Sequence, residues 1–232
     1  MKVSIIIPCY NEEQTLEKII EKILNLKVIN IKKEIIVIDD FSTDKSTQIL
    51  KNNLSDKVDL ILYNEKNFGK GYSIKRGIAA ATGDIILIQD ADLEYDPSDY
   101  PKLLNPIINN YADVVYGSRF KSTKETRVLF FWHTIGNKLL TLLSNIFTNL
   151  NLTDMEVCYK AFRSNVIKDI KLEEKRFGFE PEITAKISKK NVRIYEVGIK
   201  YFGRTYAEGK KINWKDGFSA LRCIIKYNIF KN

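Results

Sequence analysis

The chain has 232 residues, which is long enough for one α/β domain with a sizeable core. Its hydrophobic content of 44%, with 12 Tyr and 12 Phe, excludes a disordered chain. The 37 Lys and Arg residues exceed the 29 Asp and Glu residues and leave a formal charge of +8, which suits a phosphate-bearing partner but does not distinguish nucleotide, nucleic acid and anionic lipid.

Short apolar runs alternate with segments of helical spacing up to about residue 120. The expected strands are Val3–Ile7, Glu34–Ile38, Val58–Leu62, Ile85–Ile88 and Val114–Tyr116. The expected helices lie near Glu12–Leu26, Thr43–Asn53, Tyr72–Ala81 and Pro97–Asn109, with caps at Ser42-Thr43-Asp44 and Asp96-Pro97. This alternation indicates an α/β fold with a parallel sheet covered by helices.

No repeat or linker marks a domain boundary, so we expect a single domain over residues 1–232. The opening apolar run is too short for a signal peptide, and polar residues interrupt the stretch Val128–Leu150, which falls short of a membrane-spanning helix. Three separated cysteines in apolar surroundings favour buried thiols and a reducing cytoplasm.

An amphipathic helix is expected between Trp132 and Leu150, where apolar residues recur at three- and four-residue steps. Two interpretations remain open. Its apolar stripe could lie in a membrane interface, or it could pack on the sheet, because core helices have the same periodicity. The stripe comprises Trp132, Ile135, Leu139, Leu142, Leu143, Ile146, Phe147 and Leu150.

Carboxylates follow three of the expected strands, at the edge where a parallel sheet binds ligands. They are Glu12 after the first strand, Asp39 and Asp40 after the second, and Asp90, Asp92 and Glu94 after the fourth. Gathered carboxylates repel one another unless a cation lies between them. Asp90 and Asp92, with Glu94, predict a Mg²⁺ or Mn²⁺ site shared with substrate phosphates. A solvated turn is the alternative.

Several motifs in order and spacing resemble family-2 glycosyltransferases. They are Val3-Ser4-Ile5-Ile6-Ile7-Pro8-Cys9-Tyr10-Asn11-Glu12, Ile38-Asp39-Asp40-Phe41-Ser42-Thr43-Asp44, Asn67-Phe68-Gly69-Lys70-Gly71, and Gly83-Asp84 leading into Gln89-Asp90-Ala91-Asp92. Later segments resemble the polyprenyl-phosphate branch, the dolichol-phosphate mannose synthase and glucosyltransferase group. These are Gly117-Ser118-Arg119-Phe120, Thr153–Lys160, Gly178-Phe179-Glu180-Pro181-Glu182 and Gly203-Arg204-Thr205-Tyr206.

The resemblance implies a GT-A fold with a Rossmann-like, mostly parallel sheet. It also implies a GDP-mannose or UDP-glucose type of donor, inversion at the anomeric carbon, and a polyprenyl phosphate acceptor. Residues 1–119 would bind the nucleotide sugar, and residues 120–232 would bind the acceptor and face the membrane. The implied donor-binding residues are Pro8, Tyr10, Glu12, Ile38, Asp40, Asp90, Ala91, Arg119 and Lys210. Asp92, Asp154 and Arg204 are the expected catalytic residues.

A polyprenyl phosphate is already anionic, so it needs no base but does need cations, which Arg119, Arg127, Arg204, Lys210 and Lys211 would supply. The acceptor's apolar tail predicts peripheral contact with an anionic membrane, at its cytoplasmic face. Nucleic acid is not expected as a partner, because no reader motif is present.

Two other functions stay open. A transferase acting on a polysaccharide or soluble hydroxyl would need a base among Asp154, Glu180 and Glu182. The other is a non-catalytic nucleotide-binding module. Gly69-Lys70-Gly71 favours a tight turn before a helix over direct phosphate binding, since it lacks Walker spacing. His133, the sole histidine, is interpreted as structural or interfacial.

Overall fold

The computed structural model describes the chain except for residues 28–30, 122–126, 129, 206–213 and 231–232. Its strands are β1 (Lys2–Cys9), β2 (Lys32–Asp39), β3 (Leu60–Tyr63), β4 (Ile85–Ile88), β5 (Val114–Ser118), β6 (Lys160–Arg163) and β7 (Ile194–Gly198). Its helices are α1 (Leu16–Asn25), α2 (Ser46–Asn52), α3 (Lys70–Ala80), η1 (Pro97–Asp99), α4 (Tyr100–Ile108), α5 (Phe131–Thr148), α6 (Ser164–Lys168), α7 (Phe179–Ser188), α8 (Trp214–Ile225) and the π-helical turn η3 (Lys226–Phe230).

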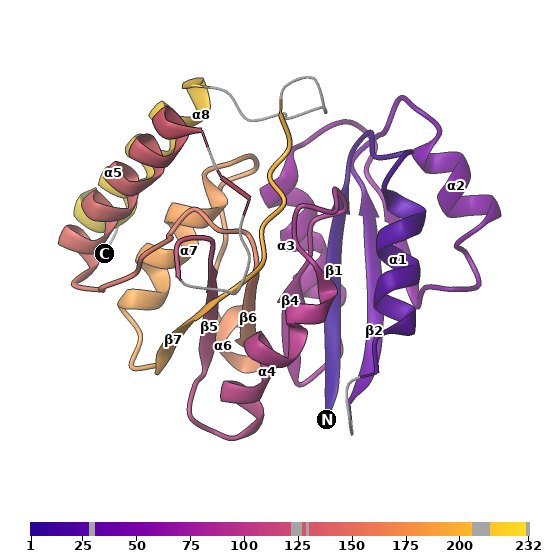
Figure 1. The fold of residues 1–232 in the computed structure, drawn as a ribbon, viewed down its shortest axis with the longest axis horizontal. Helices are drawn as coiled ribbons and strands as arrows, with labels where there is room; N and C mark the ends of the chain where they lie inside the picture. Colours follow the sequence, from indigo (N-terminus) through magenta and orange to yellow (C-terminus); the bar gives the residue numbers. More distant parts are fainter. Residues whose placement is uncertain (28–30, 122–126, 129, 206–213, 231–232) are drawn as a thin grey trace.

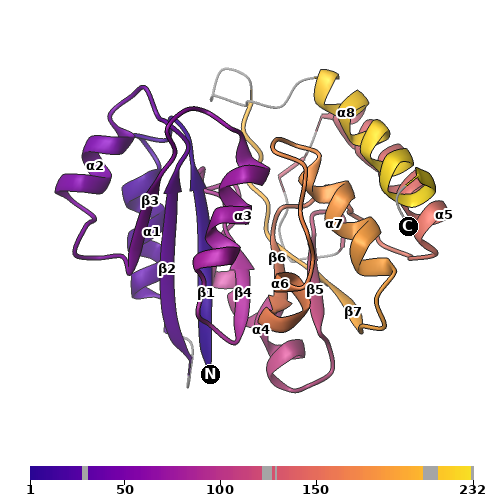
Figure 2. The ribbon, with the colours of Figure 1, turned by 180° about the vertical axis from the view of Figure 1, so that it is seen from behind.

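The strands form one seven-stranded sheet in the order β3-β2-β1-β4-β6-β5-β7. All neighbours are parallel except β6, which is antiparallel to both β4 and β5. Helices α1 and α4 cover one face, and α3 and α6 cover the other (Figures 1 and 2). The mostly parallel sheet predicted from the sequence is confirmed.

The central strands are built from apolar runs that are buried on both faces. All four residues of β4 are buried, as are Ile5, Ile6 and Ile7 of β1. Such runs suit a parallel sheet with helices on both sides, because neither face meets water. Helix α1 adds Leu16, Ile19, Ile20 and Ile23, whose spacing places them on one side of the helix.

The five strands expected from the sequence are present, and β6 and β7 were missed. β6 is only four residues long and begins and ends with a charged residue, so it shows no apolar run. The Asp96 cap is confirmed, since its side chain accepts a hydrogen bond from Ser98 N at 2.8 Å and Pro97 begins the helix. Asp44 accepts a hydrogen bond from Ser46 N at 2.9 Å, but the N-cap residue of α2 is Lys45, one residue beyond the predicted cap.

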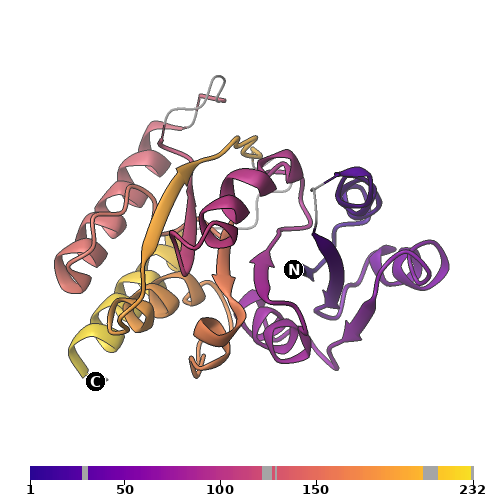
Figure 3. The ribbon, with the colours of Figure 1, turned by 90° about the horizontal axis from the view of Figure 1, so that it is seen from below.

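Helix α5 turns most of its apolar stripe outward, at the end of the sheet that carries β7 (Figure 3). Trp132 is 79% exposed, Ile146 65% and Leu142 55%. Its buried residues are Thr141, Ser144 and Thr148 instead. The stripe therefore does not pack on the sheet as a whole, although Leu143 and Leu150 contact the core.

The sequence also led to expectations about the cysteines, membrane-spanning helices and the division of the chain. Cys9, Cys158 and Cys223 are buried and form no disulfide, as predicted. In the part of the chain that the structure describes, no helix is long and apolar enough to cross a membrane. The division into residues 1–119 and 120–232 stays a prediction, and one sheet takes strands from both parts.

Candidate active site

The segments that follow the parallel strands meet at one edge of the sheet (Figure 1). Residues 201–204, distant in sequence, join them there. Tyr201 forms an antiparallel bridge with Tyr95, and Phe202 N donates to the carbonyl oxygen of Glu94 at 2.9 Å. These backbone contacts bring Arg204 beside the Asp90-Ala91-Asp92 motif.

Three carboxylates surround the guanidinium of Arg204. Its Nη2 lies 3.0 Å from Asp92 Oδ2, and its Nη1 and Nη2 each lie 3.2 Å from an oxygen of Glu12. The backbone N–H of Arg204 donates to Glu94 Oε1 at 2.7 Å. The structure thus brings together Asp92 and Arg204, two of the residues predicted to be catalytic.

Asp90, the first carboxylate of the motif, is paired with Lys70. Lys70 Nζ lies 2.9 Å from Asp90 Oδ1 and 3.9 Å from Glu180 Oε1. Burial opposes the charge on Lys70, but Asp90 leads the groups that outweigh it and hold the pKa of Lys70 well above its usual value. In the sequence, Lys70 stands out only as part of a glycine-rich turn, and no motif marks it as a partner of Asp90.

The acidic cluster has the chemistry of a site for a hard divalent cation. Burial, reinforced by Asp90 and Glu94, raises the pKa of Asp92 to about 7, although Arg204 opposes the rise. Among the described residues, no three carboxylate, imidazole or thiol groups converge to hold a metal ion alone. Mg²⁺ and Mn²⁺ commonly join one or two carboxylates to substrate phosphates. Asp92 and Glu94, which already share one cationic group, are compatible with such a site.

Asp40 holds the turn that carries Lys70. Its carboxylate accepts hydrogen bonds from Asn64 Nδ2 at 2.6 Å, Phe68 N at 3.0 Å and Gly69 N at 2.7 Å. Gly69 has φ +100°, a conformation that favours glycine, and a Cβ there would lie 2.6 Å from the carbonyl oxygen of Lys175. The turn interpretation of Gly69-Lys70-Gly71 is therefore confirmed, while base binding by Asp40 stays a prediction.

The other predicted nucleoside-binding residues lie at the same edge. Pro8 and Ile38 are partners in the register of β1 and β2. Tyr10 follows β1 and is half-buried, and Ala91 is buried within the motif. Their contacts with a nucleoside stay predictions. Lys210 and Lys211 lie outside the described residues.

Both the side chain and the backbone of Arg119 donate hydrogen bonds to the carboxylate of Asp154. Arg119 Nε and Nη2 each lie 2.7 Å from an oxygen of the Asp154 carboxylate, and the Arg119 backbone N–H donates to it at 3.0 Å. Asp154 is fully buried. This geometry makes Asp154 the residue that orients Arg119, and its catalytic role stays a prediction.

A pocket of about 240 Å³ lies beside Arg204 and ends at the first turns of α5. It combines three guanidinium groups with apolar and neutral polar side chains. Its lining residues are Arg119, Phe120, Arg127, Val128, Phe130, His133, Thr134, Asn137, Tyr201, Gly203 and Arg204. None of these described residues is a carboxylate, so the pocket suits an anion with an apolar part. Sequence reasoning missed Thr134, Asn137 and Tyr201, which no motif had marked.

The candidate bases for a hydroxyl acceptor are buried. Glu182 accepts hydrogen bonds from Glu173 N and Glu174 N, each at 2.8 Å, and is fully buried. Glu180 is 4% exposed, and burial raises its pKa although Lys70 opposes the rise. Burial, reinforced by Glu180, also raises the pKa of nearby Glu156 to about 8. Glu182 thus lies in the interior, whereas Glu180 lies 3.9 Å from Lys70, the partner of Asp90.

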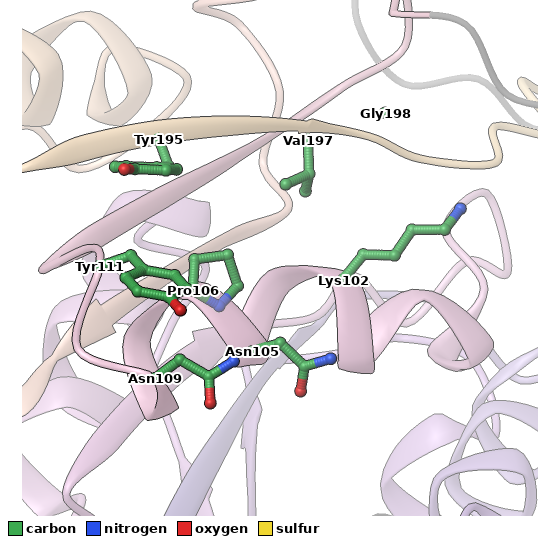
Figure 4. Close-up of a pocket in the computed structure, with 8 residues that line it drawn as sticks. All are labelled: Lys102, Asn105, Pro106, Asn109, Tyr111, Tyr195, Val197 and Gly198. Atoms are coloured by element: carbon green, nitrogen blue, oxygen red, sulfur yellow. The ribbon is translucent and has the colours of Figure 1, made fainter.

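A larger hollow of about 520 Å³ lies away from this edge, between α4 and β7 (Figure 4). In Figure 4, Tyr111 and Tyr195 lie toward its left end, and Lys102 and Gly198 lie toward its right end. It contains none of the predicted site residues. Chemistry, rather than size, therefore places the active site at the carboxyl ends of the strands.

Comparisons with known proteins identify the family of the chain. Residues 4–171 match glycosyl transferase family 2. The chain is 30% identical over 220 residues to a dolichol-phosphate mannosyltransferase of Pyrococcus furiosus, covering 91% of this chain and 61% of that protein. It is 26% identical over 212 residues to an undecaprenyl-phosphate 4-deoxy-4-formamido-L-arabinose transferase of Proteus mirabilis, covering 90% and 62%. The chain thus spans about three fifths of these two relatives.

Another relative is similar over most of its own length. It is a UDP-N-acetylglucosamine–dolichyl-phosphate N-acetylglucosaminyltransferase of Methanococcus voltae, 29% identical, with 92% of this chain and 91% of that protein covered. The predicted resemblance to the polyprenyl-phosphate branch is confirmed by these relatives.

Solved structures establish the fold. The glucosyl-3-phosphoglycerate synthase of Mycobacterium tuberculosis, in complex with Mn²⁺, uridine diphosphate and phosphoglyceric acid, superposes with a TM-score of 0.76. The match covers 100% of this chain and 80% of that chain at 19% identity. A complex of the same synthase with Mg²⁺ and uridine diphosphate gives a TM-score of 0.73 at 18% identity. The predicted GT-A fold is confirmed.

Proposed function

The chain belongs to glycosyl transferase family 2, and from this premise we propose that it transfers a hexose from a nucleoside diphosphate sugar to a polyprenyl phosphate. Its relatives are named as transferases of dolichyl or undecaprenyl phosphate, which supports a polyprenyl phosphate as the acceptor. We propose GDP-mannose or UDP-glucose as the donor and inversion as the stereochemical outcome.

The pocket beside Arg204 is the observation that supports a polyprenyl phosphate as the acceptor. Arg119, Arg127 and Arg204 present guanidinium groups, which bind phosphate through paired N–H donors. Val128 and Phe130 supply apolar surface in the same pocket. A phosphate attached to a hydrocarbon chain matches both features, whereas a sugar hydroxyl matches neither.

Two of the three candidate bases among the described residues are held by other groups, and the third, Glu180, is 4% exposed and lies 3.9 Å from Lys70. Asp154 is held by Arg119, and Glu182 is held by backbone N–H groups and Lys186. A hydroxyl nucleophile must lose a proton in the transition state, but a phosphate monoester enters the reaction as an anion. The described part of this site therefore suits a phosphate nucleophile better than a hydroxyl.

Asp92 and Glu94, with Asp90 beside them, would hold Mg²⁺ or Mn²⁺. When bound, the cation would neutralise charge on the departing diphosphate. An oxygen of the acceptor phosphate attacks the anomeric carbon, and the bond from that carbon to the diphosphate oxygen breaks. The electron pair leaves with the nucleoside diphosphate. Arg119 and Arg127 orient the acceptor, and Arg204 stabilises the leaving phosphate.

The outward stripe of α5 supports peripheral contact with an anionic membrane at its cytoplasmic face. Trp132, Leu139 and Leu142 are each at least half exposed, and the same helix lines the pocket with Thr134 and Asn137. A polyprenyl chain leaving the pocket would therefore meet apolar surface. Leu139→Glu should weaken flotation with phosphatidylserine vesicles several-fold. Leu24→Glu, at a 39% exposed position on α1, should not. Equal flotation of both variants would refute the contact.

The function is tested by a donor panel, assayed with and without polyprenyl phosphate and with metal chelated. Transfer should require the lipid phosphate, one nucleotide sugar and the divalent cation. Asp92→Asn should lower turnover at least about 100-fold, since a nearby electrostatic contact to the leaving group is worth ~3 kcal/mol. Asp113→Asn, at a carboxylate paired with Arg163 and Arg193, is the matched control. Full activity after chelation would reject the metal-dependent reaction.

A further inference from the structure

Arg204 holds the position between the carboxylates that are predicted to bind the divalent cation. Its Nη2 lies 3.0 Å from Asp92 Oδ2, and its Nε lies 3.7 Å from Glu94 Oε1. Glu12 contacts the same guanidinium with both oxygens, each at 3.2 Å. The four side chains are 8% to 17% exposed, so water does little to screen their charges.

These contacts differ from those of a permanently fixed arginine. Arg119 shows the permanent arrangement in the same site, with two N–H groups each 2.7 Å from one carboxylate. The hydrogen bonds of Arg204 are longer, and its buried Nε has no hydrogen-bond acceptor among the described residues. Charge, more than hydrogen-bond geometry, therefore holds Arg204 among the three carboxylates.

A guanidinium and a divalent cation cannot share these oxygens at close range. Both are positive, and both need the lone pairs of Asp92 that now face Arg204. Lys70 compensates Asp90 in a similar way, at 2.9 Å. Each carboxylate of the predicted cation site thus already contacts a cationic side chain of the protein, although Arg204 alone faces three carboxylates.

We propose that Arg204 is an exchangeable internal cation. It fills the position of the divalent cation in the donor-free enzyme, and it leaves Asp92 and Glu94 when the donor binds with its metal. The inference rests on the proposed function, because it requires a donor diphosphate and a cation at Asp92 and Glu94. Glu12 is the residue that keeps Arg204 nearby, since it contacts the guanidinium but is not among the predicted metal ligands.

The exchange couples the two halves of the reaction. Arg204 also lines the pocket proposed for the acceptor phosphate, so a guanidinium released from Asp92 remains beside both phosphates. Metal without nucleotide must displace Arg204 from Asp92 and Glu94 and leave it with Glu12 alone. Metal with a nucleoside diphosphate supplies a second anion for Arg204. The free enzyme should therefore bind the cation weakly, and nucleotide should strengthen that binding.

The test is the affinity for Mn²⁺ alone, measured by electron paramagnetic resonance of the free ion with no nucleotide present. Arg204→Gln removes the competing charge and should bind Mn²⁺ about tenfold more tightly than the wild type, a typical size for coupling between sites. Arg204→Lys keeps the charge and should stay within about threefold of the wild type. Arg127→Gln removes a charge from the same pocket without touching Asp92, and it should also stay within about threefold.

Repeating the titration with GDP and with UDP separates the possible failures. Nucleotide should improve Mn²⁺ binding more in the wild type than in Arg204→Gln. If the wild type binds Mn²⁺ with nucleotide but Arg204→Gln binds Mn²⁺ alone no more tightly, the exchange is refuted and the proposed function stands. If neither protein binds Mn²⁺ with either nucleotide, the metal-dependent function fails and the exchange fails with it. Equal tightening by Arg127→Gln would reduce the effect to net charge and would also refute the exchange.

Discussion

The pair formed by Arg119 and Asp154 gives a prediction that separates a positioning role from a catalytic one. Asp154→Asn keeps the shape of the side chain but removes the negative charge that faces Arg119 Nε and Nη2, each at 2.7 Å. The Asp154 side chain is fully buried and that of Arg119 is 14% exposed. Water can therefore do little to solvate the arginine charge that the substitution leaves without its partner.

The magnitude follows from this burial. Removing one partner of a buried ion pair costs about 3 to 5 kcal/mol. Because the amide oxygen of Asn can still accept a hydrogen bond from Arg119, we expect the free energy of unfolding to fall by about 3 kcal/mol. For a chain of this size, that loss lowers the melting temperature by about 6 to 12 °C. Because Arg119 lines the pocket, the KM for polyprenyl phosphate should rise about tenfold while kcat changes less.

Urea unfolding and initial rates at varied acceptor concentration measure the two effects on the same preparations. Asp113→Asn is the control, since Asp113 pairs with Arg163 and Arg193 at a more exposed position before β5. It should lose about 1 kcal/mol and keep its KM. The reasoning is refuted if Asp154→Asn unfolds within about 1 kcal/mol of the wild type with an unchanged KM. A loss of kcat alone would instead make Asp154 catalytic, as the sequence predicted.

Three further outcomes are expected. Burial alone would raise the pKa of Glu34, but hydrogen bonds from Lys2, Ser4 and Thr82 outweigh it and lower the pKa to about 2. A lowered pKa stabilises the fold above the unfolded value near 4.5, so Glu34→Gln should cost about 3 kcal/mol at pH 7, and urea titrations should show this difference vanish as pH falls from about 5 to 2. A Cβ on Gly71 would lie 2.5 Å from the carbonyl oxygen of Glu174, so Gly71→Ala should destabilise the protein by about 1 to 3 kcal/mol in calorimetry. The control Gly136→Ala on α5, where a Cβ would meet no atom within 4 Å, should stabilise the protein slightly. The reverse order of stabilities would contradict this packing. Chelation should abolish transfer yet leave the melting temperature of the donor-free protein unchanged, because Lys70 and Arg204 already compensate the carboxylates; a drop on adding chelator would count against that compensation.

Local sequence was enough to predict the first half of the sheet. The apolar runs of β1, β2 and β4 are buried whichever neighbours they pair with, so their pattern shows in the residues themselves. The same holds for the Asp96-Pro97 cap, whose hydrogen bond to Ser98 spans two residues. β6 was not predictable in this way, because its place between β4 and β5 depends on antiparallel pairing with strands far away in the chain.

The site divides along the same line. The residue types that follow each strand could be identified from the sequence, and the order of the motifs indicated the family. Three features become visible in the folded chain alone: Arg204 lies between Glu12, Asp92 and Glu94, Asp154 orients Arg119, and α5 turns its apolar side outward. Each of these depends on contacts between segments many residues apart. Charge and hydrophobicity are local properties of a chain, but the partner that compensates a buried charge is set by the packing of the whole fold.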